Sequence, residues 1–434
     1  DVVEALTLST GGFSSKYGDR TAGYLNITTR EGNRQRFTNT GLASATGVGW
    51  TSEGPIRKSH KASWLFSARK SYLDWLVNQV SDDPSSEFIF GFKDFFTKLA
   101  FEPSARQQLR LSGNLGRSRV DQHTEKNFGP NDFLFGDAKN EIATANWFWI
   151  LSNRLTLDSV VSHDKVVLEN VNFDRQLLFS SIPRQLAFKQ DVAYQATTEQ
   201  KIEAGYFARR LTQNVERRRV DVFSRQFVTS DVFSAGLWQP GAYAQHTLAT
   251  SGGRLAFTYG GRFDRLSFTG QNVWMPRASM AFSPLPNTKA TLAFGQYSQF
   301  PAFVQLLGEF GNPSLKAERA THYTVQVEHL LGDKTRIRFE LYDREDRNGI
   351  FSADTEYRLV NGVAVGPHLR SSGAQFQNNL RGYARGVEVF VERRSVNKLS
   401  GWVSYSYGVA RYRDAATDLE FDGDFDQRHT FNVY

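Results

Sequence analysis

The chain has 434 residues, no cysteine, a formal net charge of +7 and a mean hydropathy of −0.45. The lack of cysteine excludes disulfide frameworks, thiolate metal sites and cysteine nucleophiles. No apolar run approaches the ~18 residues that a membrane-spanning helix needs. Basic residues are spread along the chain and mixed with acidic ones, which argues against nucleic-acid binding, a function that needs a clustered basic face.

Residues 1–35 differ in composition from the rest of the chain. They are rich in Gly, Ser and Thr, and they contain the compact run Gly11–Arg20. Glycines at this density favour turns and close approach of the backbone to its neighbours. We therefore expect a short, tightly folded segment before the regular structure begins near Arg36.

From Arg36 onward, segments of about ten residues alternate apolar and polar side chains, the period of a β-strand. Between positions 254 and 264, Phe257 and Phe263 fall on one face, and Arg262 and Asp264 fall on the other. Ionisable groups would be costly in a dry core, but they suit a water-filled lumen. The pattern predicts an all-β chain that forms a transmembrane antiparallel β-barrel, and aromatic residues, at 14%, suit the aromatic girdles of such barrels.

The connections between these segments are alternately short and long, and about 18 segments can be distinguished. Short turns are predicted at 151–154, 198–201, 286–288, 332–334 and 395–397. Long connections are predicted at 71–90, 118–138, 168–186, 214–237, 300–319, 346–381 and 412–424, with possible short helices at 72–80 and 302–307. In outer-membrane barrels the short turns are periplasmic and the long loops extracellular, whereas a soluble sandwich would show no such asymmetry. Because this fold requires export, we expect a signal peptide upstream of Asp1.

Several stretches are similar to motifs of one known family. The first is the run Tyr17, Gly18, Asp19 and Arg20, followed by Gly23 and the residues up to 32. The others are 53–56 with 67–73, 276–279 with 297–301, 312–319, 382–388 and 426–430. In their order and spacing, these stretches together resemble the TonB-dependent outer-membrane receptors.

The resemblance implies a barrel of ~22 strands whose lumen is closed by a plug domain. Residues 1–35 would then be the C-terminal part of the plug, and residues 36–434 a transmembrane β-barrel truncated at its C-terminal end. Since about 18 of the ~22 strands are recognisable, we expect about four C-terminal strands to be missing. Most of the plug, including the segment that contacts the energy-coupling protein, would also lie outside the chain.

In relatives, arginines of the plug pair with glutamates of the inner barrel wall. Arg30 falls at the matching place in the plug, and Glu388 lies in the Gly-Val-Glu motif on a face shared with Glu392. We therefore predict that Arg30 and Glu388 form a latch between plug and barrel, since a partly buried arginine–carboxylate pair is strong and costly to break. The family's second wall glutamate is not matched, because Thr324 stands in its place.

No catalytic constellation, metal site or cofactor motif is recognisable. Asp422, Asp424 and Asp426 alternate, but the run lacks the glycine and distal glutamate of a calcium loop. Arg217, Arg218 and Arg219 could contact an anionic ligand or lipopolysaccharide, although a charged rim facing headgroups and water is the simpler interpretation.

The resemblance implies a receptor that imports a bulky or scarce solute, of the siderophore-iron, cobalamin or oligosaccharide class, by energy-coupled rearrangement of the plug. Ligand would bind to extracellular loops and the plug apex. The expected partners are a TonB-type energy-coupling protein, the solute, outer-membrane lipid and lipopolysaccharide, and the chain would be monomeric in the outer membrane of a Gram-negative-type bacterium. A passive porin-like channel, an outer-membrane barrel enzyme and, more distantly, a soluble all-β binding protein remain as alternatives.

Overall fold

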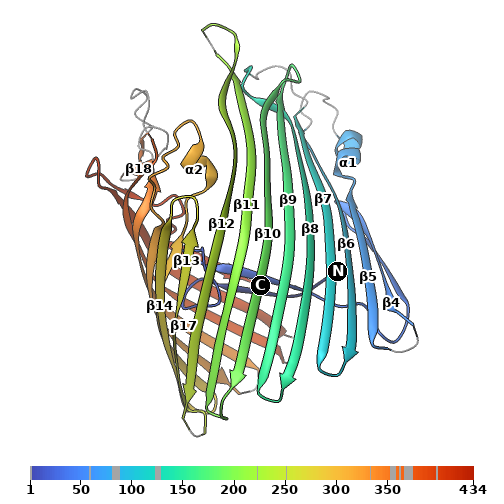
Figure 1. Ribbon diagram of the computed structural model, residues 1–434, viewed down its shortest axis with the longest axis vertical. Coiled ribbons are helices and arrows are strands. Elements are labelled where there is room, and N and C mark those ends of the chain that lie inside the picture. Colours follow the sequence, from blue (N-terminus) through green and yellow to red (C-terminus); the bar gives the residue numbers. More distant parts are fainter. Residues whose placement is uncertain are drawn as a thin grey trace. The chain divides into compact units, whose positions relative to one another are not determined.

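The computed structural model describes residues 2–57, 60–80, 88–122, 129–221, 223–250, 252–332, 334–351, 358–360, 363–365, 375–396 and 399–434. Nearly all regular structure in these residues is β-strand, with two short helices, α1 (Leu73–Val80) and α2 (Phe303–Leu307) (Figure 1). Among the described residues, no helix is long and apolar enough to cross a membrane.

The strands, in chain order, are β1 (Val3–Ser9), β2 (Tyr24–Thr29), β3 (Thr38–Ala43), β4 (Gly47–Pro55), β5 (Ala62–Ser71), β6 (Phe88–Ser104), β7 (Gln107–Gln122), β8 (Phe133–Ser152), β9 (Leu155–Asn172), β10 (Leu177–Gln195), β11 (Gln200–Val220), β12 (Phe227–Ala249), β13 (Leu255–Leu266), β14 (Gln271–Leu285), β15 (Thr288–Gln299), β16 (Glu318–Leu331), β17 (Thr335–Phe351), β18 (Arg358–Val360), β19 (Val363–Val365), β20 (Gln377–Val396), β21 (Leu399–Asp414), β22 (Glu420–Asp422) and β23 (His429–Val433).

The chain divides into two compact units. Unit 1 comprises Asp1–Leu6, Ile27–Val192 and Tyr206–Pro240, and unit 2 comprises Thr7–Asn26, Ala193–Gly205 and Gly241–Tyr434. In unit 1, β3 to β9 form an antiparallel meander in which each strand pairs with the next one along the chain. In unit 2, the same arrangement runs from β12 to β17 and continues through β20, β21 and β23.

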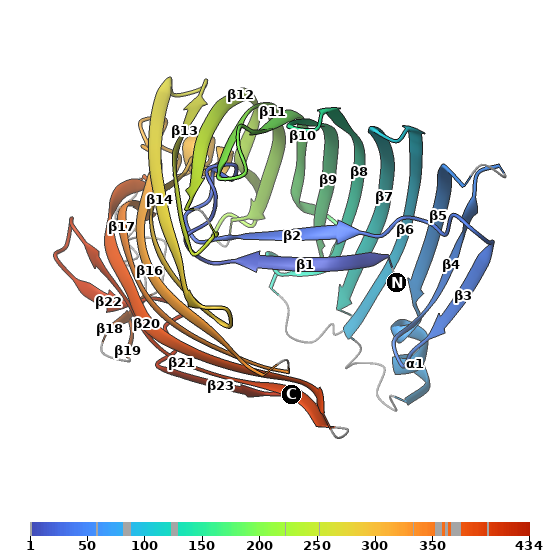
Figure 2. The same ribbon diagram turned by 90° about the horizontal axis from the view of Figure 1, so that it is seen from below.

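β1 and β2 pair only with each other, as a two-stranded sheet distinct from the large one. They appear as the pair of blue strands in Figure 2. The segment Gly11–Arg20 connects them, so the N-terminal residues are folded separately from the sheet that follows.

The registers confirm the alternation read from the sequence. Phe257 lies opposite Leu248 on β12 and Met280 on β14, and all three side chains are exposed. Arg262 and Asp264 on the opposite face are buried, with 4% and 1% of their side chains exposed. The fold-class prediction is therefore confirmed: the chain is nearly all-β and forms the large antiparallel sheet of a transmembrane β-barrel. The expected water-filled surroundings of Arg262 and Asp264 are wrong, because residues of the N-terminal segment cover them.

Both predicted helices are present, and the short turns at 151–154, 198–201 and 286–288 overlap the ends of successive strands. Two predicted long connections are wrong. The stretch 168–186 lies in β9 and β10 except for 173–176, and the stretch 214–237 lies in β11 and β12 except for 221–226. The polar run Glu216–Arg219 interrupts the alternation in β11 although the strand continues, and the apolar start of β10, Leu177–Phe179, was wrongly assigned to a loop.

Candidate functional site

The segment Gly11–Arg20 approaches the sheet of unit 2 very closely. A Cβ on Gly12, whose φ is +60°, would lie 3.0 Å from the Cβ of Ala293, and a Cβ on Gly11 would lie 3.1 Å from Thr324 Cγ2. Only glycine tolerates this combination of backbone conformation and proximity. The small Thr324 side chain leaves the space that Gly11 and Gly12 need.

An aromatic cluster anchors the segment. Phe13, Tyr297 and Ala320 form a buried core, against which Tyr17 and Tyr24 pack. The ring centroids of Phe13 and Tyr297 are 4.2 Å apart, and those of Tyr17 and Tyr24 are stacked at 3.8 Å. Burial, and next the neighbouring Tyr17, raise the pKa of Tyr24 to about 12, so this phenol stays neutral at physiological pH.

Two arginines of the sheet hold the main chain of the segment. Arg277 Nη1 donates hydrogen bonds to the carbonyl oxygens of Phe13, at 3.2 Å, and of Ser14. Its guanidinium carbon lies 4.9 Å from the ring centroid of Phe13 and 4.3 Å from that of Tyr297, within cation–π range. Arg277 is buried, so carbonyl dipoles and aromatic faces replace the water that its charge would otherwise need.

Arg262 is the second arginine that binds the main chain of the segment. Its Nη1 donates to the carbonyl oxygens of Lys16, at 3.0 Å, and Ser15, at 3.4 Å, while its Nε donates to Asp264 Oδ2 at 2.9 Å. A Cβ on Gly18 would lie only 1.9 Å from Arg262 Nε. A larger residue in place of the glycine of the Tyr-Gly-Asp-Arg motif would therefore have to displace the Arg262 side chain from these contacts.

Hydrogen bonds to β12 and to the residue after β15 complete the attachment. Gln245 Oε1 accepts from Ser14 Oγ at 2.8 Å and from the Ser15 amide at 3.2 Å. Asp19 Oδ1 accepts from the Phe300 amide at 2.8 Å. Arg20 is half exposed and pairs with Asp19 at 3.8 Å, and a Cβ on Gly23 would collide with the carbonyl oxygen of Ser9.

Unit 1 contains a second set of contacts between the N-terminal residues and the sheet. Arg30 Nη1 lies 2.5 Å from Glu53 Oε2 on β4, and the same oxygen accepts from the Asn33 amide at 2.9 Å. Lys98 Nζ on β6 donates to the carbonyl oxygen of Thr29 at 2.5 Å. An arginine of the N-terminal residues therefore pairs with a glutamate of a sheet strand, and that glutamate is Glu53.

Glu31 is the centre of a charge network beside this pair. Its carboxylate lies 2.6 Å from Arg34 Nη2 and 2.6 Å from Arg110 Nε on β7, and Arg34 in turn lies 2.6 Å from Glu102. Burial alone would raise the pKa of Glu31, but hydrogen bonds from Arg110 and Arg34 outweigh it and hold the pKa below its ordinary value.

The predicted partner Glu388 lies on β20 in unit 2, opposite Glu340 on β17 and Ser406 on β21. Arg30 lies in unit 1, and the Arg30–Glu388 latch stays a prediction. Asp422 and Asp426 both lie near Arg428 Nη2, at 3.2 Å and 3.0 Å. Within the described ranges, no group of three or more His, Asp or Glu side chains could hold a metal ion.

The arginine run at 217–219 has partners within the protein. Arg217 lies 3.6 Å from Asp231 and stacks over Phe179, while Arg218 pairs with Glu216 and stacks over Phe227. These contacts favour the interpretation as a charged strand end.

The comparison with family models decides the relationship. The model for "TonB dependent receptor-like, beta-barrel" matches residues 6–434. The chain belongs to this family. No curated protein matches its sequence.

Solved structures of similar fold are TonB-dependent siderophore and iron receptors. The siderophore receptor PirA from Acinetobacter baumannii superposes with a TM-score of 0.75 at 13% identity, covering 100% of this chain and 70% of that one. The FrpB iron transporter from Neisseria meningitidis, F3-3 variant, superposes with a TM-score of 0.74 at 13% identity. The match covers 100% of this chain and 72% of the transporter. The copper transporter OprC superposes with a TM-score of 0.68 at 14% identity, and the match covers 95% of this chain and 67% of the transporter. At these identities the likeness shows the fold.

Proteins of the TonB-dependent receptor family are outer-membrane transporters and receptors of Gram-negative bacteria, not enzymes. In this member, a hollow of about 250 Å³ lies in unit 2 beside Thr21. It has carboxylates, guanidiniums and aromatic rings in its lining, including Glu318, Asp346, Arg344, Tyr412, Phe351 and Phe421. Such a mixed lining can bind a polar solute through both hydrogen bonds and ring stacking.

Sequence reasoning found part of this site. It singled out the motif 17–20, Arg30 and the inward charges Arg262 and Asp264, but it missed Glu53, Arg277 and Glu31 as contact residues. Glu53 and Arg277 lie in two of the family-like stretches, so their positions carried a signal. The partners of Arg277 carried no signal, because carbonyl oxygens of the main chain cannot be recognised from residue type.

Proposed function

We propose that the chain is part of an outer-membrane receptor that imports a bulky or scarce solute by energy-coupled rearrangement of its N-terminal segment. The observation that carries this proposal is the docking of residues 13–19 onto the inward face of β12–β15 through Arg262, Arg277 and Gln245. A segment held by side chains and hydrogen bonds, and not woven into the sheet, can leave without breaking the sheet's ladders.

The domain division belongs to the same proposal. Residues 1–35 would be the C-terminal part of a plug and residues 36–434 the barrel, which the separate β1–β2 sheet supports. The latch between Arg30 and Glu388 is retained as a proposal. Glu388 lies directly opposite Glu340, and like charges at opposite positions destabilise a sheet, so a cation near both carboxylates would be favourable.

The transported solute would belong to the siderophore-iron, cobalamin or oligosaccharide class. The neighbours described as siderophore receptors and iron transporters favour the first of these. We propose the hollow beside Thr21 as part of the ligand site, together with extracellular loops, and a TonB-type protein as the energy source. The receptor would act as a monomer in contact with outer-membrane lipid and lipopolysaccharide.

A reversible tether tests the proposal, and the absence of cysteine makes the chain suited to it. Ser14→Cys with Gln245→Cys replaces a pair whose side chains are in hydrogen-bond contact at 2.8 Å. In cells that contain the energy-coupling protein, the oxidised double variant should not accumulate ligand, and reductant should restore uptake to the level of Ser14→Cys alone.

The passive porin-like alternative predicts the opposite result. Uptake would not depend on the membrane energy source, and the tether would leave it unchanged. The pair Arg30→Cys with Glu388→Cys tests the latch in the same background, with a bismaleimide whose spacer is as long as an arginine–glutamate pair, because a disulfide spans too short a distance. No crosslink with this reagent, while each single cysteine is labelled by a maleimide, would contradict the latch.

A further inference from the structure

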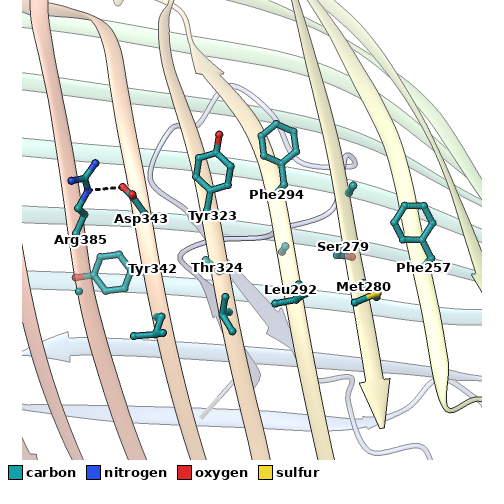
Figure 3. A pocket seen from close by; sticks show the side chains of 15 residues that line it. Phe257, Ser279, Met280, Leu292, Phe294, Tyr323, Thr324, Tyr342, Asp343 and Arg385 are labelled. Carbon is teal, nitrogen blue, oxygen red and sulfur yellow. Dashed lines mark hydrogen bonds and ion pairs between the residues drawn. The ribbon is translucent and has the colours of Figure 1, made fainter. Parts of the chain in front are cut away.

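An apolar groove crosses the outward face of unit 2. It has a volume of about 630 Å³ and is lined on neighbouring strands by apolar and aromatic side chains, among them Phe257, Met280, Leu292, Phe294, Tyr323 and Leu341. Figure 3 shows Phe257, Met280, Leu292, Phe294 and Tyr323 on neighbouring strands, with Asp343 and Arg385 at one end. Its apolar side chains lie on the outward face, and its lining also includes Ala293 and Thr324, the two residues against which Gly12 and Gly11 of the N-terminal segment pack.

The outward face of β17 changes character along the strand. Ile337, Phe339 and Leu341 come first, and Asp343, Glu345 and Arg347 follow at the same two-residue spacing. Since alternate residues of a strand share a face, an apolar surface gives way to a charged one at a single level. That level is the expected boundary between the hydrocarbon of a bilayer and its headgroups.

A polar hollow adjoins the apolar groove at this boundary. Its volume is about 390 Å³, and Arg385 lines both it and the groove. Arg347 and Arg381 also line the hollow, together with Glu345 and Asp346. Arg347 and Asp346 line the hollow beside Thr21 as well, whereas Arg381 and Arg385 do not. Groove and hollow therefore form one continuous amphipathic site on β13–β17 and β20.

The charges around the hollow are incompletely balanced. Arg385 Nε lies 3.0 Å from Asp343, and Arg347 lies 3.6 Å from Glu345. Asp346 accepts a hydrogen bond from Arg344 at 2.8 Å. Arg381 has no acidic partner within 4 Å in the described part of the chain.

Two arginine pairs also lie at directly opposite positions on neighbouring strands. Arg319 is opposite Arg347, and Arg381 is opposite Arg413. All four side chains are exposed. Like charges placed in this way destabilise a sheet unless an anion lies between them.

We propose that this amphipathic site binds an anionic phosphorylated lipid of the outer leaflet, with an acyl chain in the apolar groove and a phosphate at Arg347, Arg381 and Arg385. Guanidiniums bind phosphate oxygens through paired hydrogen bonds, which the unbalanced charge favours. The long connections after β17 and β21 begin at this end of the strands, the extracellular side in barrels of this kind. The inference rests on the proposed location in the outer membrane, but it does not depend on import.

Lipid retention by the purified full-length protein tests the site. The protein would be delipidated in mild detergent, mixed with phosphatidic acid or phosphatidylcholine, and examined by native mass spectrometry. The variant Arg347→Gln with Arg381→Gln should retain phosphatidic acid at least about fivefold more weakly than the parent protein. The control Arg254→Gln with Arg265→Gln removes the same charge from exposed positions outside the site, and it should retain phosphatidic acid as the parent does.

Three results would overturn the proposal. They are equal retention by the site variant and the control, equal retention of phosphatidylcholine and phosphatidic acid, and full displacement of the lipid by inorganic phosphate, which would indicate a free-anion site. The single variant Arg381→Gln disturbs no ion pair within the described residues. Its retention of phosphatidic acid can be measured instead if the double variant folds poorly. Since no energy-coupling protein is present, failure here leaves the import proposal untouched.

Discussion

At the residue scale, arginine side chains of the sheet bind the N-terminal segment by donating hydrogen bonds to its main-chain carbonyl oxygens. Arg277 and Arg262 together contact the carbonyl oxygens of residues 13–16. In unit 1 the cation belongs to the N-terminal residues and the anion to the sheet, because Arg30 pairs with Glu53 on β4. The carbonyl contacts depend on the shape of the segment more than on its side chains, so they are lost as soon as the segment changes conformation.

Substitution of Arg277 should loosen the segment and leave the sheet intact. Arg277→Gln removes charge-assisted hydrogen bonds of about 1.5–3 kcal/mol each and a cation–π contact of about 1–2 kcal/mol. Hydrogen exchange at amides 13–17 should therefore become faster, while exchange in β20 and β21 should not change. Arg338→Gln is the matched control, since Arg338 stacks on Phe390 of β20 and not on the segment. Unchanged exchange at residues 13–17 would contradict the role assigned to Arg277.

The sequence identified those residues whose type and spacing alone indicate their role. Arg262 and Asp264 were recognisable because charges occur at alternate positions opposite Phe257 and Phe263. Glu53 was not recognised as the partner of Arg30, because 23 residues separate them and many glutamates were available. Only the folded positions of β4 and the residues after β2 bring the two together.

At the element scale, the network around Glu31 joins the residues after β2 to three strands. Glu31 contacts Arg110 on β7, Arg34 contacts Glu102 on β6, and Arg30 contacts Glu53 on β4. Ion pairs therefore attach the connection between the N-terminal sheet and β3 to the barrel strands of unit 1. In unit 2, by contrast, aromatic packing around Phe13 contributes most of the attachment.

This attachment should weaken in acid. The pKa of Glu31 lies below its ordinary value of 4.5 in the folded protein. A carboxyl with a lowered folded-state pKa contributes stability above its unfolded-state pKa and loses it as pH falls through the folded-state value. Exchange at amides 29–34, corrected for its intrinsic pH dependence, should therefore accelerate as pH falls from about 5 to about 3. In Glu31→Gln it should already be fast at pH 7, with a smaller response to acid. An identical acid response in the variant would show that other groups are responsible.

The strands themselves were predictable where one face is apolar, and their ends were not. The polar end of β11 and the start of β12 were assigned to a loop, but the strands continue to a turn at which the Asp221 amide donates to the carbonyl oxygen of Gln226 at 2.8 Å. The Asp221 carboxylate accepts hydrogen bonds from the amides of Ser224, at 2.7 Å, and Phe223, at 3.2 Å. Hydrogen bonds from Ser224 and Phe223 lower the pKa of Asp221. A backbone ladder needs no apolar face, so its continuation beyond the apolar band leaves no periodicity in the sequence.

At the scale of the whole molecule, inward and outward faces of the same strands serve different surroundings. On β17, Leu341 is outward and lines the apolar groove, while Arg344 is inward and lines the hollow beside Thr21. On β13, Phe257 is outward, while Arg262 is inward and holds the N-terminal segment. One period-two pattern therefore encodes a lipid-facing surface and a docking surface at the same time.

If the docked segment obstructs the pore, removing it should change conductance without unfolding the barrel. The full-length protein, refolded into a planar bilayer, should conduct little. A variant in which residues 11–20 are replaced by a Gly-Ser linker of equal length removes the Phe13 anchor and the carbonyl partners of Arg262 and Arg277. It keeps the ladders of β12–β17. This variant should show large, steady open events and a β-sheet circular dichroism spectrum like that of the parent. A parent protein that is already open would indicate a passive pore. A variant that stays closed would place the obstruction elsewhere, and the role of residues 11–20 in gating would have to be abandoned.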